Sequence, residues 1–249
     1  MKKHIPNLIT LGNLFCGTIA TIFAVHGAFG LAAFFVVLGI FLDFFDGFAA
    51  RLLNVSGELG KQLDSLADMV TSGVVPGIVM MNLLTDKNGL NYFGEETTAT
   101  YFKDLDIELF PFFGLLLTLG ACYRLAKFNI DTRQTDSFIG LPTPAMSLFV
   151  IALPLIKMNT EIELVYTVLN NRYFLIAITL LLTFLMNAEL PLFSLKFKEY
   201  SIKNNLIKYL FLVVSLAMII FLQYLSIPLI VTLYIVLSVI SNFNKKKVV

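Results

Sequence analysis

Long apolar runs recur along this chain and constrain its fold more than any other feature. About 20 consecutive apolar residues span a bilayer as a helix, and eight stretches of the 249-residue sequence approach or reach that length. They are residues 5–25, 29–53, 61–84, 109–129, 144–156, 173–186, 206–225 and 227–241. The sequence therefore predicts an all-α, polytopic membrane protein with about eight transmembrane helices, the first of them retained rather than cleaved as a signal peptide.

Composition supports this class and argues against others. The chain is 57% hydrophobic and 14% charged, whereas a soluble domain carries roughly 25% charged residues. A net charge of +1 gives no indication of nucleic-acid binding. Two cysteines are too few for a disulfide framework, and no Cys/His cluster has the spacing of a zinc site.

The distribution of lysine and arginine predicts the orientation of the spans, because these residues gather on the cytoplasmic side. With the N-terminus in the cytoplasm, 14 of the 18 lysines and arginines lie on the inner side of the membrane. An even number of spans then places both termini in the cytoplasm.

Four aspartates interrupt the apolar pattern around the turn between the second and third runs. Asp43 and Asp46 come near the inner end of the second run, and Asp64 and Asp68 near the inner start of the third. At ~1.5 Å per residue, the first pair lies roughly 10–15 Å and the second roughly 5–10 Å from the inner surface. Helical periodicity places each pair on a single face. Two neighbouring helices thus bring four carboxylates to overlapping depths.

Carboxylates at this depth need a compensating charge, and intramembrane acids are usually functional. A divalent cation, Mg²⁺ or Mn²⁺, prefers oxygen ligands and would supply that charge. Small residues on the same stripe, Gly47 and Ala50, leave room for a ligand. The alternative is a set of interfacial residues paired with Arg51 and Lys61, but four acids on matched faces favour a metal site.

The spacing from Asp43 to Asp68 is D-x-x-D-G-x-x-A-R, eight residues, then G-x-x-x-D-x-x-x-D. It resembles the signature of the CDP-alcohol phosphotransferases, which are integral membrane enzymes with a six-helix core and are usually dimeric. Members transfer a phosphatidyl or phosphoalcohol group from a CDP-linked donor to an alcohol and release CMP. The resemblance implies a catalytic core over residues 1–186, with a cytosolic loop and two additional helices over residues 187–249.

The same resemblance implies roles for individual residues. Asp43, Asp46 and Asp64 would ligate a divalent metal, and Asp68 would complete the cluster and act as the catalytic base. The residues that would border the CDP group are Gly47, Ala50, Arg51, Gly60 and, from the first helix, Asn7 and Thr10. Helix capping explains Asn7 and Thr10 equally well.

Two further stretches resemble the bacterial membrane-type phosphatidylserine synthases within that family. They are IPNLITLGNLFCG (residues 5–17) and YRLAKFNIDTRQTDSFIGLPTPAM (residues 123–146). The implied acceptor is L-serine, whose carboxylate a cationic side chain would hold. The candidate acceptor-binding residues are Arg124, Lys127, Asn129, Arg133 and Thr143. Topology alone also explains cations at inner helix ends, and G-L-P-T-P is also a common turn and helix start.

The expected partners are CDP-diacylglycerol, L-serine, membrane lipids and a second copy of the chain. The expected location is the inner membrane of a bacterium, with the site facing the cytosol. Three alternatives stay open: the same chemistry on glycerol 3-phosphate or an inositol compound, a transporter with an intramembrane carboxylate site, and a polyprenyl transferase. The last is disfavoured because no later helix carries a second D-x-x-x-D run.

Overall fold

A computed structural model describes residues 4–55, 57–85, 109–131, 138–192 and 205–246, most of which are helical. The helices are α1 (Ile5–Val25), α2 (Phe29–Leu52), α3 (Glu58–Asp68), η2 (Met69–Val74), α4 (Val75–Leu84), η4 (Phe110–Leu115), α5 (Leu116–Ile130), α6 (Thr143–Asn159), α7 (Glu163–Leu169), α8 (Arg172–Asn187), α9 (Leu206–Leu222), η5 (Gln223–Leu225) and α10 (Ser226–Lys246). Two-residue strands, β1 (Phe138–Ile139) and β2 (Pro191–Leu192), pair antiparallel.

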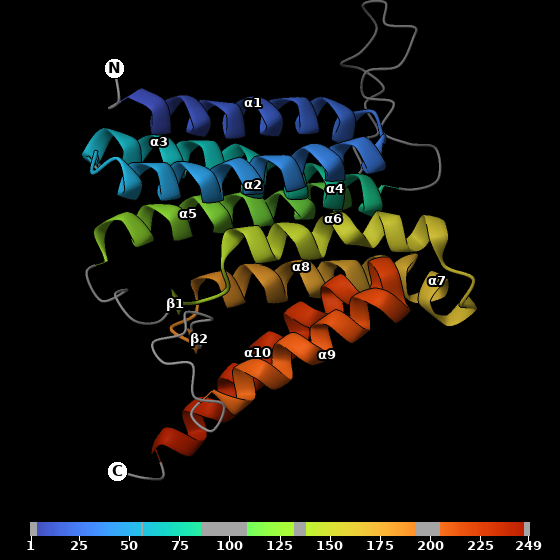
Figure 1. The fold of residues 1–249 in the computed structure, drawn as a ribbon. Helices are drawn as coiled ribbons and strands as arrows, with labels where there is room; N and C mark the ends of the chain where they lie inside the picture. The colour runs from blue at the N-terminus through green and yellow to red at the C-terminus, as the bar shows by residue number, and fades with distance from the viewer. Residues whose placement is uncertain (1–3, 56, 86–108, 132–137, 193–204, 247–249) are drawn as a thin grey trace, which may run out of the picture.

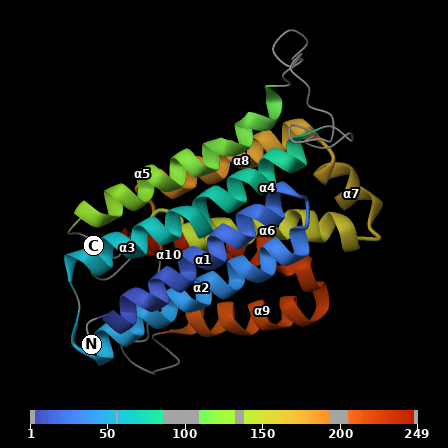
Figure 2. The same cartoon turned by 90° about the horizontal axis from the view of Figure 1, so that it is seen from above.

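The helices lie side by side and alternate in direction (Figure 1). The start of α1, the α2–α3 connection, the β1–β2 pair and the end of α10 gather at one end of the molecule, and the α1–α2 turn and α7 lie at the other (Figure 1). Figure 2 shows α1 running between α2 on one side and α3 and α4 on the other, in agreement with its contacts. Helix α1 thus holds together the end of α2 and the start of α3, where the four aspartates were expected.

All eight predicted apolar runs are largely helical, and the all-α membrane class is confirmed. Among the described residues, four segments are long and apolar enough to cross a bilayer, namely Ile5–Val25, Phe29–Leu52, Glu58–Leu84 and Leu206–Ser241. The bent pair α7 and α8 would be a fifth if it forms one span. At 17 residues, α6 is apolar but shorter than these segments. The total of about eight spans therefore stays a prediction.

Small residues bring α1 and α2 close together, as is typical of helix pairs in membranes. Their turn passes through Gly27, whose φ of +71° is the left-handed conformation that suits glycine at a helix end. The facing surfaces bury alanines and glycines, among them Ala20, Ala24, Ala33 and Gly39.

The predicted third run is not one regular helix. It begins as α3, widens into the π-helix η2 directly after Asp68, and continues as α4. Periodicity did not predict this break, nor the short helix α7, because both depend on packing between helices rather than on the local sequence.

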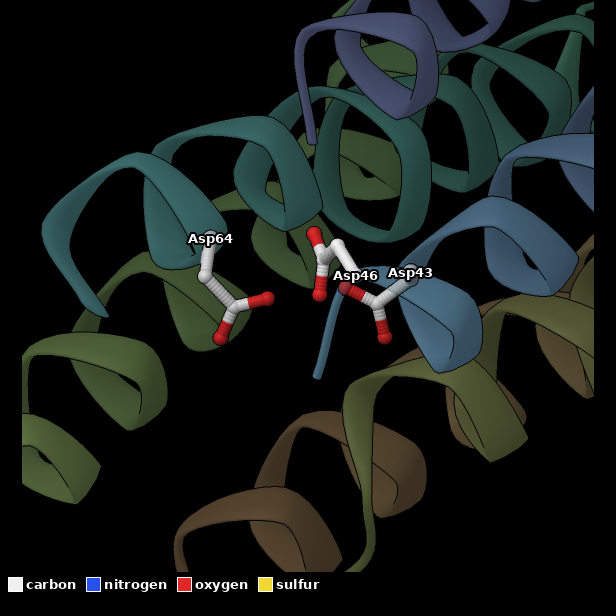
Figure 3. Close-up of side chains that lie close together, drawn as sticks. All are labelled: Asp43, Asp46 and Asp64. Carbon is white, nitrogen blue, oxygen red and sulfur yellow. The ribbon is translucent and has the colours of Figure 1, made fainter. Parts of the chain in front are cut away.

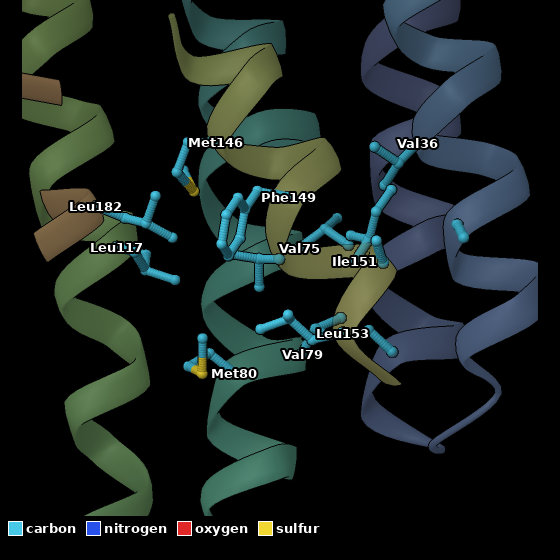
Figure 4. Close-up of a cluster of buried hydrophobic side chains, with 14 of the residues drawn as sticks. Val36, Val75, Val79, Met80, Leu117, Met146, Phe149, Ile151, Leu153 and Leu182 are labelled. Carbon is cyan, nitrogen blue, oxygen red and sulfur yellow. The ribbon is translucent and has the colours of Figure 1, made fainter. Parts of the chain in front are cut away.

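The hydrophobic core lies among α2, α4, α5, α6 and α8 (Figure 4). Its largest fully buried side chains include Met80 on α4, Leu117 on α5 and Met146 on α6. This packing holds α4 and α6 against α5, and so sets where the starts and ends of these helices lie.

The start of α6 is fixed by a turn at Gly140, whose φ is +74°. The amide of Gly140 donates to the Leu190 carbonyl (2.9 Å), and the amide of Leu141 donates to the Leu185 carbonyl (2.9 Å). The G-L-P-T-P stretch therefore docks on the end of α8, which explains its glycine by backbone geometry.

Helices α9 and α10 form an antiparallel hairpin that crosses the remaining helices at an angle (Figure 1). The rings of Phe211 and Tyr234 meet with centroids 5.9 Å apart, and the chain reverses at Gln223, whose φ is +46°. The segment Leu206–Ser241 thus consists of two antiparallel helices. The domain boundary after residue 186 stays a prediction.

Candidate active site

Three carboxylates meet where α2 ends and α3 begins (Figure 3). Asp43 and Asp46 are three residues apart on α2 and so share a face, and Asp64 reaches toward them from α3. One oxygen atom from each of the three lies within 4.8 Å of the others. The two helices, joined by a short connection, therefore build a compact triad of acids from separate turns.

The triad has the chemistry of a divalent cation site. Asp46 is buried, and the Oδ1 atom of Asp43 is buried without a hydrogen-bond partner among the described residues. Three like charges this close repel one another, and a buried oxygen without a partner loses free energy. A hard cation such as Mg²⁺ or Mn²⁺ accepts oxygen ligands in this arrangement and removes both penalties. The donor set therefore fits the expected metal.

Helix α1 braces one member of this triad. The Thr10 hydroxyl lies 2.5 Å from Oδ2 of Asp46 and 3.0 Å from the carbonyl oxygen of Pro6. Its single proton donated to the carboxylate holds Asp46 in its rotamer. Thr10, which the resemblance placed beside the CDP group, therefore touches a carboxylate directly.

Asp68 lies one turn beyond Asp64 but outside the compact triad. It is buried, and its Oδ1 accepts a hydrogen bond from Nδ2 of Asn13 at 3.2 Å. Arg124 on α5 is near enough to interact with it electrostatically. The sequence analysis expected Asp68 to complete the metal cluster and to act as the base. In the structure, Asp68 lies outside the group of three acids that meet and has Asn13 as its own partner.

An open pocket of about 690 Å³ adjoins the triad. It is lined by Pro6, Asn7, Thr10, Asp43, Phe44, Asp46, Gly47, Ala50, Arg51, Val55, Gly57, Gly60, Lys61 and Asp64. A Cβ atom added to Gly47 would meet nothing within 4 Å, so the absence of a side chain there leaves open space in the pocket. All six residues expected beside the CDP group line this one pocket, and their roles stay predictions.

The expected acceptor residues do not form one group. Arg124 is 8% exposed and its Nε has no hydrogen-bond partner among the described residues; the same holds for the buried Oγ1 of Thr143. Lys127 instead pairs with Glu189 (3.6 Å). Asn129 accepts hydrogen bonds from Lys61 and Ser65, which tie the end of α5 to α3. Arg133 lies outside the described residues.

Several polar residues near these positions were missed by sequence reasoning. The buried hydroxyls of Ser72 on η2 and Ser147 on α6 have no hydrogen-bond partner among the described residues. Asn13 and Thr71 are fully buried and bonded to each other. Polar residues facing inward from apolar helices are the only signal the sequence carries for them, and that signal gives no partner.

Comparisons with known proteins place these residues in a family context. The CDP-alcohol phosphatidyltransferase family model matches residues 3–185. The chain is 38% identical over 146 residues to a CDP-diacylglycerol–serine O-phosphatidyltransferase of Bacillus subtilis, a match that covers 57% of this chain and 70% of that protein. It is 36% identical over 148 residues to the protein of that name from Helicobacter pylori, covering 59% of this chain and 55% of that protein.

A more distant relative is the archaetidylserine synthase of Methanothermobacter thermautotrophicus. It is 25% identical over 162 residues, which cover 64% of this chain and 61% of that protein. The chain thus spans little more than half the length of some of these relatives. The hairpin of α9 and α10 lies beyond the part that the family model matches.

Proposed function

This chain belongs to the CDP-alcohol phosphatidyltransferase family, and we propose that it transfers the phosphatidyl group of CDP-diacylglycerol to L-serine, giving phosphatidylserine and CMP. The observation that carries the proposal is the aspartate triad opening onto a pocket lined by small and cationic residues. The relatives named for serine transfer support the choice of acceptor. The product places the protein in phospholipid biosynthesis.

Asp43, Asp46 and Asp64 would hold the divalent metal, since their oxygens lie within 4.8 Å of one another. When bound, Mg²⁺ or Mn²⁺ would neutralise charge on the diphosphate of the donor and stabilise the charge that develops during transfer. The Thr10 hydroxyl keeps Asp46 oriented for this task.

The pocket suits the nucleotide end of the donor. Its volume of about 690 Å³ lies within the range of ligand pockets, roughly 300–1,000 Å³. Arg51 and Lys61 line it and would contribute positive charge toward phosphate. The missing side chains at Gly47 and Gly60 would let the ligand approach the backbone of α2 and α3.

Asp68 would accept the proton of the serine hydroxyl. The serine oxygen then forms a bond to the lipid-side phosphorus, the bond from that phosphorus to the bridging oxygen of the diphosphate breaks, and CMP leaves with the electron pair. Positioning and charge stabilisation dominate phosphoryl-type transfer, so a buried carboxylate beside the triad fits the role of base.

The serine itself would be recognised by the buried polar atoms that lack partners. The Arg124 guanidinium would pair with the serine carboxylate, and the hydroxyls of Thr143, Ser72 and Ser147 offer hydrogen bonds. Lys127 is a weaker candidate because Glu189 already pairs with it. Asn129 would act indirectly, by holding α3 against α5.

The cytosolic face is the proposed location of the site, within the inner membrane of a bacterium and with both termini in the cytoplasm. The lysine and arginine distribution supports this orientation. A homodimer is proposed from the resemblance to the family, whose members are usually dimeric.

The test is an acceptor screen with purified protein, CDP-diacylglycerol and Mg²⁺ or Mn²⁺. Labelled L-serine should appear in phosphatidylserine as CMP is released in equal amount. CMP release with glycerol 3-phosphate or an inositol compound, but not with serine, would overturn the acceptor assignment. Metal uptake into sealed vesicles without any CMP release would overturn the transferase assignment altogether.

A further inference from the structure

Asn13 and Thr71 form a buried chain of hydrogen bonds that ends on Asp68. Both residues are 0% exposed. The Thr71 hydroxyl on η2 lies 2.8 Å from Oδ1 of Asn13 on α1, and Nδ2 of Asn13 lies 3.2 Å from Oδ1 of Asp68. These hydrogen bonds run from Thr71 on η2 to Asn13 on α1 and back to Asp68, the last residue of α3. They therefore connect two residues that are three positions apart in sequence.

The direction of the hydrogen bonds follows from the donors available. A threonine hydroxyl carries one proton, and an amide side chain has one accepting and one donating end. If Thr71 donates to Oδ1 of Asn13, then Nδ2 must face Asp68, as found. The reverse orientation would place the amide oxygen against the carboxylate oxygen, where two acceptors repel. The Thr71 hydroxyl also lies 3.2 Å from the backbone carbonyl oxygen of Asn13, farther than the 2.8 Å to Oδ1. Its proton on the nearer acceptor, together with the accepting carboxylate of Asp68, fixes which end of the Asn13 amide meets Asp68.

The backbones of two neighbouring helices approach this pair closely at glycines. A Cβ atom added to Gly39 would lie 2.8 Å from Oδ1 of Asn13 and 2.8 Å from Cγ2 of Thr71. A Cβ atom on Gly17 would lie 3.0 Å from the backbone of Thr71. Two helices thus approach the pair closely at glycines, and the π-helix that begins directly after Asp68 contains Thr71. Such π-helical turns are frequent at functional sites.

We propose that Asn13 is a positioning residue for the transfer reaction, with Thr71 fixing its orientation. Asn13 holds Oδ1 of Asp68, which reserves Oδ2 for the acceptor hydroxyl. The inference rests on the proposed function of Asp68 as base. A residue that acts in this way changes turnover rather than donor binding, because it touches neither the pocket nor the triad.

The test compares variants of Thr71 and Asn13 in the full-length protein. Thr71→Val keeps the shape of the side chain but removes the hydroxyl donor, and Thr71→Ser restores the donor. Loss of the hydrogen bond from Thr71 to Asn13 should lower kcat for CMP release about 10-fold in Thr71→Val. Thr71→Ser should recover most of that loss. Asn13→Leu should lower kcat about 100-fold through misplacement of the base. The KM for CDP-diacylglycerol should stay within about twofold throughout.

Two comparisons separate positioning from mere stability. Because Thr71 acts through Asn13, the double variant Asn13→Leu/Thr71→Val should lose no more activity than Asn13→Leu alone. Thr179→Val, which removes another fully buried hydroxyl on α8, is the matched control and should keep wild-type kcat. Unfolding midpoints in detergent should not rank the variants in the order of their kcat values.

Independent, multiplicative losses in the double variant would overturn the proposal, as would losses of kcat that follow the unfolding midpoint. Equal activity of Thr71→Val and wild type would overturn the role of Thr71. The outcome is separable from the acceptor assignment. If an alcohol other than serine drives CMP release, the same kcat comparisons apply with that alcohol, because the proposal concerns Asp68 and not the acceptor pocket.

Discussion

At the scale of single residues, the four aspartates divide into two kinds. Asp43, Asp46 and Asp64 meet at a common point, whereas Asp68 is bonded to Asn13 and lies outside that triad. The division suggests that the cation and the proton are handled by different carboxylates. Substitutions can separate these two tasks.

Asp68→Asn should abolish turnover and leave metal binding largely intact. The amide keeps the size of the side chain but cannot take a proton, and a general base contributes roughly 10²–10⁴ in rate. The measurement is CMP release under single-turnover conditions, with Mn²⁺ binding measured on the same preparation. Activity close to that of the wild type would exclude Asp68 as the base.

Gly47→Leu should block the donor pocket without harming the fold. A side chain at Gly47 enters open space in the pocket, so the KM for CDP-diacylglycerol should rise about 10-fold or more, equivalent to about 1.4 kcal/mol. Gly30→Leu is the matched control, since Gly30 is also on α2, lies outside the pocket, and has nothing within 4 Å of the position that a Cβ atom would take. Both variants gain helix propensity of up to about 1 kcal/mol. A similar KM in both would contradict the location of the donor.

Sequence reasoning located the acids because acidic residues are conspicuous in an apolar run, and the structure brings three of them together. Gly47, Ala50 and Gly60, which the family resemblance placed beside the CDP group, line the adjoining pocket, and their roles stay predictions. The sequence gives no comparable signal for Asn13 and Thr71. These two residues are 58 positions apart, and only the contact between α1 and η2 brings them together.

At the scale of helices, glycines set how closely neighbours approach. A Cβ atom on Gly114 of η4 would lie 2.5 Å from the backbone nitrogen of Met81 on α4, where no flexible side chain can move aside. Gly114→Ala should therefore destabilise the protein by about 1–3 kcal/mol through overpacking. The check is the unfolding midpoint in detergent against Gly30→Ala, which has open space. Equal midpoints would show that η4 and α4 separate freely.

Apolar periodicity located the helices well and described their interruptions poorly. The run predicted over residues 61–84 contains α3, η2 and α4, and the bend between α7 and α8 was not expected. A π-helical turn depends on what the helix packs against. Here Thr71 bonds to α1 and the carbonyl of Gly73 accepts from Thr118 on α5, so the interruption is a tertiary feature.

At the scale of the whole molecule, the predicted membrane orientation rests on the distribution of lysine and arginine and is open to direct test. The exposed Glu58, the first residue of α3, should face the cytoplasm, and the exposed Asn170, between α7 and α8, should face outward. Single cysteines introduced at these two positions, with Cys16 and Cys122 replaced by alanine, should differ in their reactivity toward a membrane-impermeant thiol reagent. Asn170→Cys should react in intact cells and Glu58→Cys only after permeabilisation. The reverse pattern would put the pocket on the wrong side for a cytosolic nucleotide.

The proposed function depends most directly on a divalent cation held between α2 and α3 by carboxylates. Titration of the purified protein with Mn²⁺, followed by the electron paramagnetic resonance signal of free Mn²⁺, measures this binding. Asp64→Asn should weaken it about 10-fold or more through the loss of one of three ligands, whereas Glu163→Gln, on the exposed helix α7, should not change it. Equal Mn²⁺ affinity in the wild type and Asp64→Asn would contradict a cation site formed by these carboxylates.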